Sequence, residues 1–457
     1  MTNLQSLEQI VTVSNDTEVI MKHSYDWWPV ATKWRQQGKQ PYKPDIVAYP
    51  NNIAEISEVL RWVNEHHVAV TPWGAGSSVG ASLPLNGGIT LNLSRMTRTL
   101  AIDTHNLMVT VETGKMGHDL ETELNAKGYT LNHSPQSLSR STVGGWVATR
   151  ATGQFSSRYG GIEDMVIALT VVLPSGEVIH TKQTPRAAIG TDLKHVFIGS
   201  EGTLGVVAEV TLKIFALAEY RRFEAIQFNN LEAGVHTIRD MIQVGLRPFL
   251  VRYYDEDEAK HAMKDAEFNS CVMFLGFEGD QAVANAEYDT CETIWSRYEG
   301  APLGSASVEA WMNRRFDFST VENILAKPGG VAETIEVSHF WNGIVDTYHL
   351  LKEALAPLAS EVLGHFSHVY PQGSSLYMIL LGEVGNASEA EARILKIWDV
   401  SMEICLQTGA ALSHHHGAGL ARLPYMQREL GDSRVALQLL KKAFDPNNIL
   451  SPGKFSL

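Results

Sequence analysis

Cysteine is scarce in this sequence, which has only Cys271, Cys291 and Cys405 among its 457 residues. No two of them are spaced as a Cys-x-x-Cys pair or as a zinc-binding set. A disulfide framework needs more cysteines than this, and a thiolate metal site needs them at short spacing. We therefore expect neither feature, and we expect the three thiols to be buried as small hydrophobic side chains.

Positive charge and long apolar runs are also lacking. The chain has 37 Lys and Arg against 51 Asp and Glu, so it has no global positive field for nucleic acid or anionic lipid. The longest apolar runs, such as residues 165–173, fall far short of the roughly 20 residues that span a bilayer. Residues 1–13 lack the basic start and apolar core of a secretory signal. These absences predict a cytoplasmic protein with no integral membrane segment and no nucleic-acid partner, whose anionic substrate would need a local cationic pocket.

Short strand-like and helical stretches alternate along the chain and indicate an α+β fold of two domains. Apolar residues recur at helical spacing over 53–63, behind the N-cap candidates Asn51 and Asn52. Strands are predicted at 68–71, 89–93, 108–112, 166–173, 206–215, 249–253, 271–276 and 375–381, and further helices at 282–298, 344–356 and 387–408. We divide the chain into an N-terminal helical segment (1–42), a first domain (43–218), a second domain (219–410) and a C-terminal segment (411–457).

A glycine-rich loop follows the first of these strands and contains Pro72, Gly74, Gly76, Ser77 and Ser78. It is not a Rossmann fingerprint, because the third glycine of Gly-x-Gly-x-x-Gly would fall on a valine and no helical pattern follows. Glycine without a Cβ still lets successive N–H groups turn onto a pyrophosphate, and the serines add hydroxyl donors. A tight turn without a ligand is the alternative.

Two more loops complete a pattern. The second, residues 133–164, reads His-Ser-Pro at its start, then Ser-Thr-Val-Gly-Gly-Trp and Tyr-Gly-Gly-Ile-Glu-Asp, and the third, residues 199–205, reads Gly-Ser-Glu-Gly-Thr-Leu-Gly. In this order the three loops resemble the FAD-binding domain of the vanillyl-alcohol-oxidase superfamily, also called the PCMH type. The resemblance implies two α+β subdomains that hold an extended FAD over residues 43–218. It also implies an α+β cap, the C-terminal domain of FAD-linked oxidases, over the flavin ring.

The resemblance also implies the residues that hold FAD. The pyrophosphate would lie on Pro72, Gly74, Gly76, Ser77 and Ser78, and the remainder of the cofactor would contact Pro135, Ser141, Thr142, Gly144, Gly145, Gly153, Tyr159 and Val206. Some relatives bond the flavin covalently to a His or Cys of these loops. Residues 74–78 and the stretch after Gly145 contain neither, so we expect noncovalent FAD.

Within the superfamily, the second half is similar to alkylglycerone-phosphate synthase. The matching residues are His133, Arg252, Trp311 with Arg314 and Arg315, Tyr377, and the triplet His414, His415 and His416. In that family the tyrosine, the triplet and the arginine surround the flavin and a phosphate-bearing substrate. Imidazoles titrate near neutrality and suit proton removal from a hydroxyl, although each could be a packing residue instead. We take His416 as the first candidate base, and Arg252 as a bidentate partner for a carboxylate or phosphate.

A neighbouring branch, the D-lactate and D-2-hydroxyglutarate dehydrogenases, holds a divalent metal with two histidines and a glutamate. Here Tyr377 replaces one ligand and His415 replaces the glutamate, so we expect no metal. A zinc site built from His365, His368 and the triplet is the alternative.

Two reactions fit these residues. The first is the oxidation of a small anionic alcohol or 2-hydroxy acid, in which a histidine or Tyr377 removes the hydroxyl proton and a hydride passes to flavin N5. The second is an ether-forming transfer on an acyl-dihydroxyacetone phosphate. We favour the oxidoreductase, with a small-molecule substrate and an electron acceptor of unspecified kind, in a chain that is also compatible with a homodimer.

Overall fold

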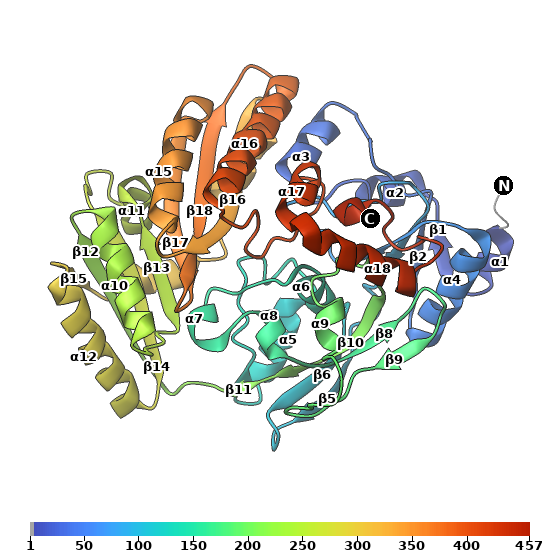
Figure 1. The fold of residues 1–457 in the computed structure, drawn as a ribbon, viewed down its shortest axis with the longest axis horizontal. Helices are drawn as coiled ribbons and strands as arrows, with labels where there is room; N and C mark the ends of the chain where they lie inside the picture. The colour runs from blue at the N-terminus through green and yellow to red at the C-terminus, as the bar shows by residue number, and fades with distance from the viewer. Residues whose placement is uncertain (1–3) are drawn as a thin grey trace.

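Four β-sheets organise residues 4–457, the part of the chain that the computed structural model describes (Figure 1). Three of the sheets come from residues 12–216, and the largest, with seven strands, comes from residues 220–383. Because most strands pair antiparallel and helices cover the sheets, the predicted α+β class is confirmed. Residues 1–3, the start of the predicted N-terminal segment, lie outside the described residues. The division at residues 42, 218 and 410 stays a prediction.

The first sheet is a β-α-β layer with the strand order β1-β2-β4-β3. Its strands are β1 (Thr12–Ser14), β2 (Ile46–Tyr49), β3 (Val70–Trp73) and β4 (Ile89–Asn92), and the last three are parallel. Helix α4 (Ile53–His66) covers the sheet and begins where the Asn52 side chain accepts a hydrogen bond from the N–H of Glu55. The apolar stripe predicted over 53–63 faces the sheet and is buried. Strand β3 ends directly before the first glycine loop.

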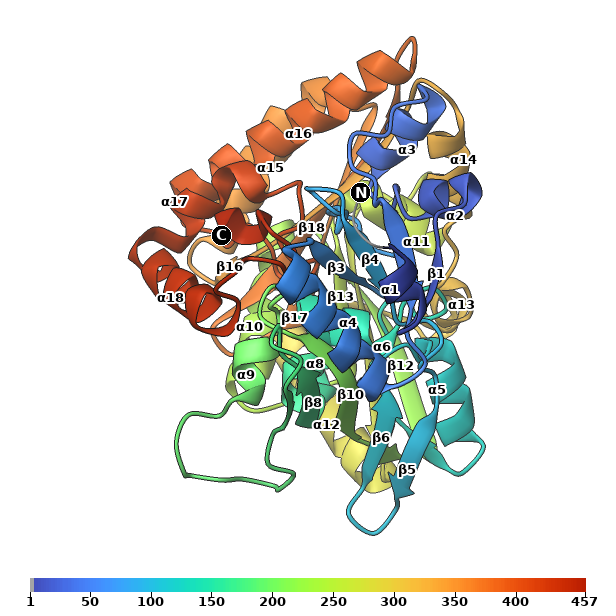
Figure 2. The same cartoon turned by 90° about the vertical axis from the view of Figure 1, so that its right-hand side faces the viewer.

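The second sheet is antiparallel, with the order β5-β6-β10-β8-β9. Its strands are β5 (Thr99–Asp103), β6 (Met108–Glu112), β8 (Val166–Val172), β9 (Val178–His180) and β10 (Val206–Lys213), and β7 (Tyr129–Thr130) pairs with β11 (Phe215–Ala216) nearby. Five short helices accompany this sheet: α5 (Gly117–Asn125), α6 (Val143–Thr149), α7 (Ser156–Tyr159), α8 (Ile162–Met165) and α9 (Lys194–Phe197). The loop between β9 and α9 extends away from the body (Figure 2). Helix α6 begins inside the second glycine loop.

The seven-stranded antiparallel sheet forms the cap, with the order β15-β12-β14-β13-β17-β18-β16. Its strands are β12 (Tyr220–Phe228), β13 (Leu250–Tyr254), β14 (Cys271–Gly279), β15 (Ala301–Gly304), β16 (Gly330–Phe340), β17 (Glu361–Val369) and β18 (Gly373–Glu383). One face packs against α10 (Leu231–Gln243), α12 (Gln281–Arg297), α15 (Ile344–Leu355) and α16 (Ala387–Thr408). The opposite face packs against α11 (Glu256–Met263), α13 (Ala306–Arg314) and α14 (Ser319–Ala326).

Both ends of the chain join the two halves. At the start come α1 (Leu4–Glu8), α2 (Thr17–Lys22) and α3 (Pro29–Gln36), and the ammonium of Lys33 in α3 donates to the carbonyls of Leu325 and Lys327 in the cap. At the end come α17 (Met426–Leu430) and α18 (Arg434–Phe444), which lie over the first half (Figure 1). The final segment adds to β3, because the N–H of Val70 donates to Ile449 at 2.7 Å and the N–H of Ser451 donates to Val70 at 2.8 Å.

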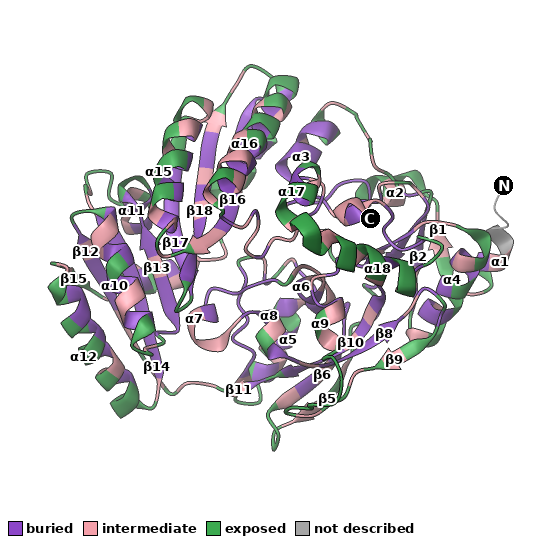
Figure 3. Cartoon of the chain, viewed as in Figure 1, coloured by how far each residue is buried: buried purple, intermediate pink, exposed green. Residues whose placement is uncertain are grey.

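Burial follows the sheets, while α18 shows a largely exposed outer face (Figure 3). All three cysteines are buried and free, as the sequence predicted. Among the described residues, no helix has both the length and the apolar character that a membrane crossing requires. The sequence did not predict ten of the strands in the described part of the chain: β1, β2, β5, β7, β9, β11, β12, β15, β16 and β17. Of these, β16 matters most, because it carries a buried glutamate next to the histidine triplet.

Candidate active site

One cavity of about 760 Å³ lies between the glycine loops and the cap sheet. Its volume is within the range of cofactor and ligand sites. Eleven of the thirteen predicted FAD residues line it: Pro72, Gly74, Gly76, Ser77, Ser78, Pro135, Ser141, Thr142, Gly144, Gly145 and Val206. So do four of the six predicted catalytic residues, Arg252, Tyr377, His415 and His416. Residues far apart in the sequence therefore meet in one space.

The first loop is a cradle of unpaired backbone donors. Gly76 has φ of 69°, and a Cβ there would overlap the ring of Trp73, while a Cβ at Gly74 would overlap the Thr142 hydroxyl. Within residues 4–457, no acceptor receives a hydrogen bond from the N–H groups of residues 75–79. Such a row of free N–H groups is a nest for an anion, and it fits the pyrophosphate of FAD.

The second loop is held rigidly beside the first. The Thr142 hydroxyl accepts from the N–H of Gly145 at 3.2 Å and so caps α6, and the indole N–H of Trp146 donates to the Ser141 hydroxyl at 2.7 Å. A Cβ at Gly144 would press against Thr113, so the absent side chain lets the loop approach the sheet. The first residues of α6 thus face the cavity with a fixed backbone.

Four predicted site residues do not line the cavity: His133, Gly153, Tyr159 and His414. A Cβ at Gly153 would collide with the backbone of Ser134, and the Tyr159 hydroxyl donates to Glu278 of β14 at 2.5 Å. His133 is buried against the ring of Trp146, and neither of its ring nitrogens has a hydrogen-bond partner among the described residues. Burial lowers the pKa of His133 to about 3, so the ring is neutral. His414 does not line the cavity; its Nδ1 contacts His415, and its Nε2 contacts the hydroxyl of the partly exposed Tyr370.

The carboxylate of Glu336, on β16, holds the histidine triplet in place. It accepts hydrogen bonds from the backbone N–H groups of His414, His415 and His416 at 2.5, 3.1 and 3.1 Å. The Ser413 hydroxyl and the Arg422 guanidinium add two more, at 2.7 and 2.8 Å. Burial would raise the pKa of Glu336, but the surrounding histidines and the Arg422 cation hold it well below its usual value. Glu336 is therefore an anion at the centre of the site.

The same loop is fixed from two further sides. Besides Glu336, the buried Arg422 donates to the carbonyls of Leu412 and Gly417, which closes residues 412–422 into a ring. From the first half of the chain, the carboxylate of Glu201 accepts from the N–H groups of Ala418 and Gly419. The triplet is thus anchored to the cap and to the glycine-loop half together.

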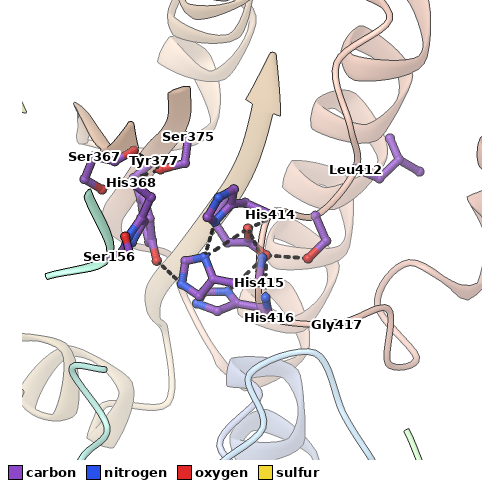
Figure 4. Close-up of polar contacts among 12 residues, drawn as sticks. Ser156, Ser367, His368, Ser375, Tyr377, Leu412, His414, His415, His416 and Gly417 are labelled. Carbon is purple, nitrogen blue, oxygen red and sulfur yellow. Dashed lines mark hydrogen bonds and ion pairs between the residues drawn. The ribbon is translucent and has the colours of Figure 1, made fainter. Parts of the chain in front are cut away.

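Tyr377, His415 and His414 form a hydrogen-bonded group (Figure 4). The Tyr377 hydroxyl lies 2.5 Å from Nε2 of His415, and Nδ1 of His415 lies 2.7 Å from Nδ1 of His414. Burial raises the pKa of Tyr377 well above its usual value and lowers the pKa of His415 to about 3. At neutral pH the tyrosine is therefore protonated and His415 is neutral, which makes the pair a hydroxyl bonded to an available base.

Arg252, on β13, supplies a partly buried cation to the same cavity. Its Nε donates to the Tyr254 hydroxyl at 2.9 Å, and one terminal nitrogen donates to Nε2 of His365, also at 2.9 Å. His365 in turn donates from Nδ1 to Glu258, so its tautomer is fixed and its ring is neutral. No carboxylate of the described residues forms an ion pair with Arg252. Its remaining donors are free for an anion.

Beyond Arg252 the cavity continues between α13, α14 and the cap sheet. Arg315 lines this part, and burial lowers its pKa to about 10. Apolar side chains line the far end: Val321, Leu325, Ala332, Ile379 and Leu381. The cavity therefore combines a cationic region with an apolar arm.

Three residues of the site escaped the sequence analysis as functional positions: Glu201, Glu336 and Arg422. Glu201 lies inside the quoted third loop, but its partners are more than two hundred residues away in sequence. The one signal for Glu336 is that the sequence of β16 places two glutamates, Glu333 and Glu336, among apolar residues, which is rare in a buried strand unless the charges are paired. Arg422 gave no sequence signal at all.

One group of side chains resembles a metal site. Oxygen and nitrogen atoms of Glu336, His414 and His415 lie within 4.8 Å of one another. However, both oxygens of Glu336 already accept hydrogen bonds, and Nδ1 of His414 and Nδ1 of His415 are bonded to each other. A metal would have to break these bonds, so we keep the expectation of a metal-free site.

Comparisons with known proteins agree with this fold. Family models match residues 44–182 to the FAD binding domain and residues 217–455 to the C-terminal domain of FAD linked oxidases. An alkyldihydroxyacetonephosphate synthase of Trypanosoma brucei brucei is 30% identical over 96% of this chain and 76% of its own. The FAD-linked oxidoreductase YgcU of Escherichia coli (strain K12), itself called uncharacterized, is 33% identical over 90% of this chain and 88% of its own.

A solved structure of alkyldihydroxyacetonephosphate synthase superposes with a TM-score of 0.83 over 99% of this chain and 85% of that one, at 22% identity. That likeness shows a flavoprotein fold with a PCMH-type FAD-binding half and a cap. The chain belongs to the FAD-linked oxidase family. The predicted fold, the FAD cofactor and the class of FAD-dependent enzyme are confirmed. The residues that bind FAD, and its noncovalent attachment, stay predictions.

Replacing Gly76 by valine should abolish FAD binding. The new side chain would overlap Trp73 and would be strained at a φ of 69°. Gly190→Val is the matched control, because Gly190 has φ of 74° but nothing within 4 Å of its Cβ position. The flavin-to-protein absorbance ratio of the purified variants measures the effect. Full flavin occupancy in Gly76→Val would show that this loop is not part of the cofactor site.

Removing metal with a chelator should leave flavin content and turnover unchanged, because the donors of Glu336, His414 and His415 are already engaged with one another and with the backbone. Metal analysis of the purified protein and activity after dialysis measure this. Activity that is lost on chelation and restored by zinc or manganese would reverse the assignment.

Proposed function

We propose that this protein is an FAD-dependent dehydrogenase or oxidase of a small anionic alcohol or 2-hydroxy acid. The observation that carries the proposal is one cavity lined both by Arg252, a partly buried cation without an ion-pair partner among the described residues, and by the Tyr377–His415 pair. The cation attracts an anionic substrate, and the pair accepts a proton. Bound FAD would supply the electron acceptor for a hydride from the substrate carbon.

The two glycine loops would hold the cofactor. The free N–H groups of residues 75–79, with the hydroxyls of Ser77 and Ser78, suit the pyrophosphate. The start of α6, at Gly144 and Gly145, and the backbone near Val206 would line the rest. Because Thr142 and Trp146 already hold the second loop by hydrogen bonds, little ordering free energy would be lost there on binding.

Arg252 would orient the substrate. Two of its five N–H donors are engaged with Tyr254 and His365, and the planar fork can offer the others to a carboxylate or phosphate. Arg315 adds a second positive charge to the same cavity. This local cationic region is what an anionic substrate needs in a protein with a formal net charge of -14.

Tyr377 is the better placed of the two candidate proton acceptors. When it takes the hydroxyl proton of the substrate, it can pass its own proton to Nε2 of His415, so no charge is left on the buried phenol. His416, our first candidate from the sequence, lines the cavity too, and burial lowers its pKa to about 4. It would have to become a buried cation, stabilised only by Glu336 at 3.5 Å.

The apolar arm of the cavity favours a second candidate, an ether-forming transfer of the kind named for the synthase relative. Val321, Leu325 and Leu381 offer a surface for an aliphatic chain, which a small hydroxy acid would not need. Such a reaction leaves no net electrons on the flavin. The two candidates therefore differ in whether turnover requires an electron acceptor.

Replacing Arg252 by lysine should weaken substrate binding more than it slows flavin reduction, because an ammonium keeps the charge and loses the planar fork. In anaerobic stopped-flow experiments with a series of 2-hydroxy acids and hydroxyalkyl phosphates, we expect the wild-type flavin to be bleached. The half-saturating substrate concentration should rise roughly tenfold or more in the variant. Arg239→Lys, on α10 and paired with Asp240, is the matched control and should behave as wild type.

The second candidate, the ether-forming transfer, predicts a different result. Turnover of an acyl-dihydroxyacetone phosphate with a fatty alcohol, without any electron acceptor and without lasting bleaching of the flavin, would contradict the proposed oxidation.

A further inference from the structure

A row of hydrogen bonds leads from the cavity to the surface. The Tyr377 hydroxyl lies 2.5 Å from Nε2 of His415, Nδ1 of His415 lies 2.7 Å from Nδ1 of His414, and Nε2 of His414 lies 2.8 Å from the Tyr370 hydroxyl. Tyr377 lines the cavity, whereas Tyr370 is 38% exposed. Figure 4 shows the inner part of this row, with His415 between Tyr377 and His414. The row joins a buried reaction space to solvent.

Each member of the row can both donate and accept. A neutral imidazole has one protonated and one bare nitrogen, and a phenol has one hydrogen and two lone pairs. If Tyr377 donates to His415, then His415 donates from Nδ1 to His414, and His414 donates from Nε2 to Tyr370. The reverse arrangement satisfies every contact equally well. Burial lowers the pKa of both His414 and His415 to about 3, so both rings are neutral at neutral pH, as this pattern requires.

The surrounding contacts hold the side chains of the row in place. The backbone N–H groups of His414 and His415 are bonded to Glu336, so neither ring can swing away with its loop. The ring of His368 stacks on His414 at 5.2 Å, and the ring of His365 stacks on Tyr377 at 4.6 Å. These stacks leave the ring-edge nitrogens and the hydroxyls as the contact points along the row.

We propose that Tyr377, His415, His414 and Tyr370 form a proton path that carries the hydroxyl proton of the substrate from the cavity to solvent. This inference rests on the proposed oxidation, because a path for one proton is needed only if the substrate loses one. Tyr377 lines the cavity, whereas His414 and Tyr370 do not, so they act on the reaction only through His415 and Tyr377.

The step balances in atoms and charge. The substrate hydroxyl loses its proton to the oxygen of Tyr377, and the Tyr377 proton moves to Nε2 of His415. The Nδ1 proton of His415 moves to His414, the Nε2 proton of His414 moves to Tyr370, and the Tyr370 proton leaves to water. Bound FAD would accept the carbon-bound hydrogen of the substrate together with both electrons of that bond, which would leave a carbonyl. One proton enters the path and one leaves, and both imidazoles change tautomer without becoming charged.

Replacing His414 by alanine removes the middle of the path and should slow anaerobic flavin reduction by roughly 100-fold. The substrate used is the hydroxy acid that bleaches the wild-type flavin fastest. Added imidazole should restore a large part of the rate, because it can occupy the vacated space and relay the proton. Tyr370→Phe should cause a smaller loss. His349→Ala and Tyr298→Phe, far from the cavity and paired with Glu232 and Asp240, are the matched controls and should reduce at the wild-type rate.

A wild-type rate in His414→Ala, or a loss that imidazole leaves unchanged, would overturn the proton path.

A second measurement needs no substrate. In the FAD-loaded protein with isotope-labelled histidine, nitrogen NMR at neutral pH should show one proton on each of the two rings and a coupling between their Nδ1 atoms. Two doubly protonated rings, or no coupling, would overturn the path on their own. If no hydroxy compound bleaches the flavin, the proposed oxidation fails, and the NMR result still decides whether the row exists.

Discussion

The buried carboxylate of Glu336 is the interaction on which the rest of the site depends. Five donors converge on it, three of them successive backbone N–H groups of the histidine triplet, and its charge is balanced by Arg422 at 2.8 Å. A buried anion is stable only when its lone pairs are used and its charge is paired, and here both conditions hold. With Glu336 ionised, these five hydrogen bonds hold the loop in the position that the structure shows. That position sets the direction of the His415 and His416 rings and the contact to Tyr377.

Glu201 ties this cap-anchored loop to the glycine-loop half, so the cavity is closed by contributions from both halves of the chain. The final segment adds to this link, because its backbone extends the sheet at Val70, immediately before the first glycine loop. The cofactor end and the substrate end of the cavity are therefore held at a fixed separation. A rigid site of this kind suits transfer between two bound molecules, since reacting groups must approach in one geometry.

The sequence predicted those parts whose requirement is local. The strand over 108–112 and the helix over 387–408 have the predicted bounds, and the glycines of the first loop were recognised because a positive φ or a close approach demands that residue type. The strand that carries Glu336 was missed, since its glutamates break the apolar pattern. Glu336 and Arg422 are 86 residues apart, so no spacing rule connects them. His133 was chosen through resemblance, but it does not line the cavity and packs against the ring of Trp146, which does. Its residue type alone could not predict on which side of Trp146 it would lie.

The central claim, that an ionised Glu336 organises the site, is tested most directly by the stability of Glu336→Gln. Glutamine has the same shape, but its NH₂ group would meet donors where an acceptor is needed, and Arg422 would lose its counter-charge. Thermal unfolding of the FAD-loaded protein is followed by the rise in flavin fluorescence as FAD is released. The free energy of unfolding of Glu336→Gln should be about 3 kcal/mol or more below that of the wild type. Glu383→Gln, on the exposed end of β18, should show none. Equal stability of Glu336→Gln and wild type would contradict the account.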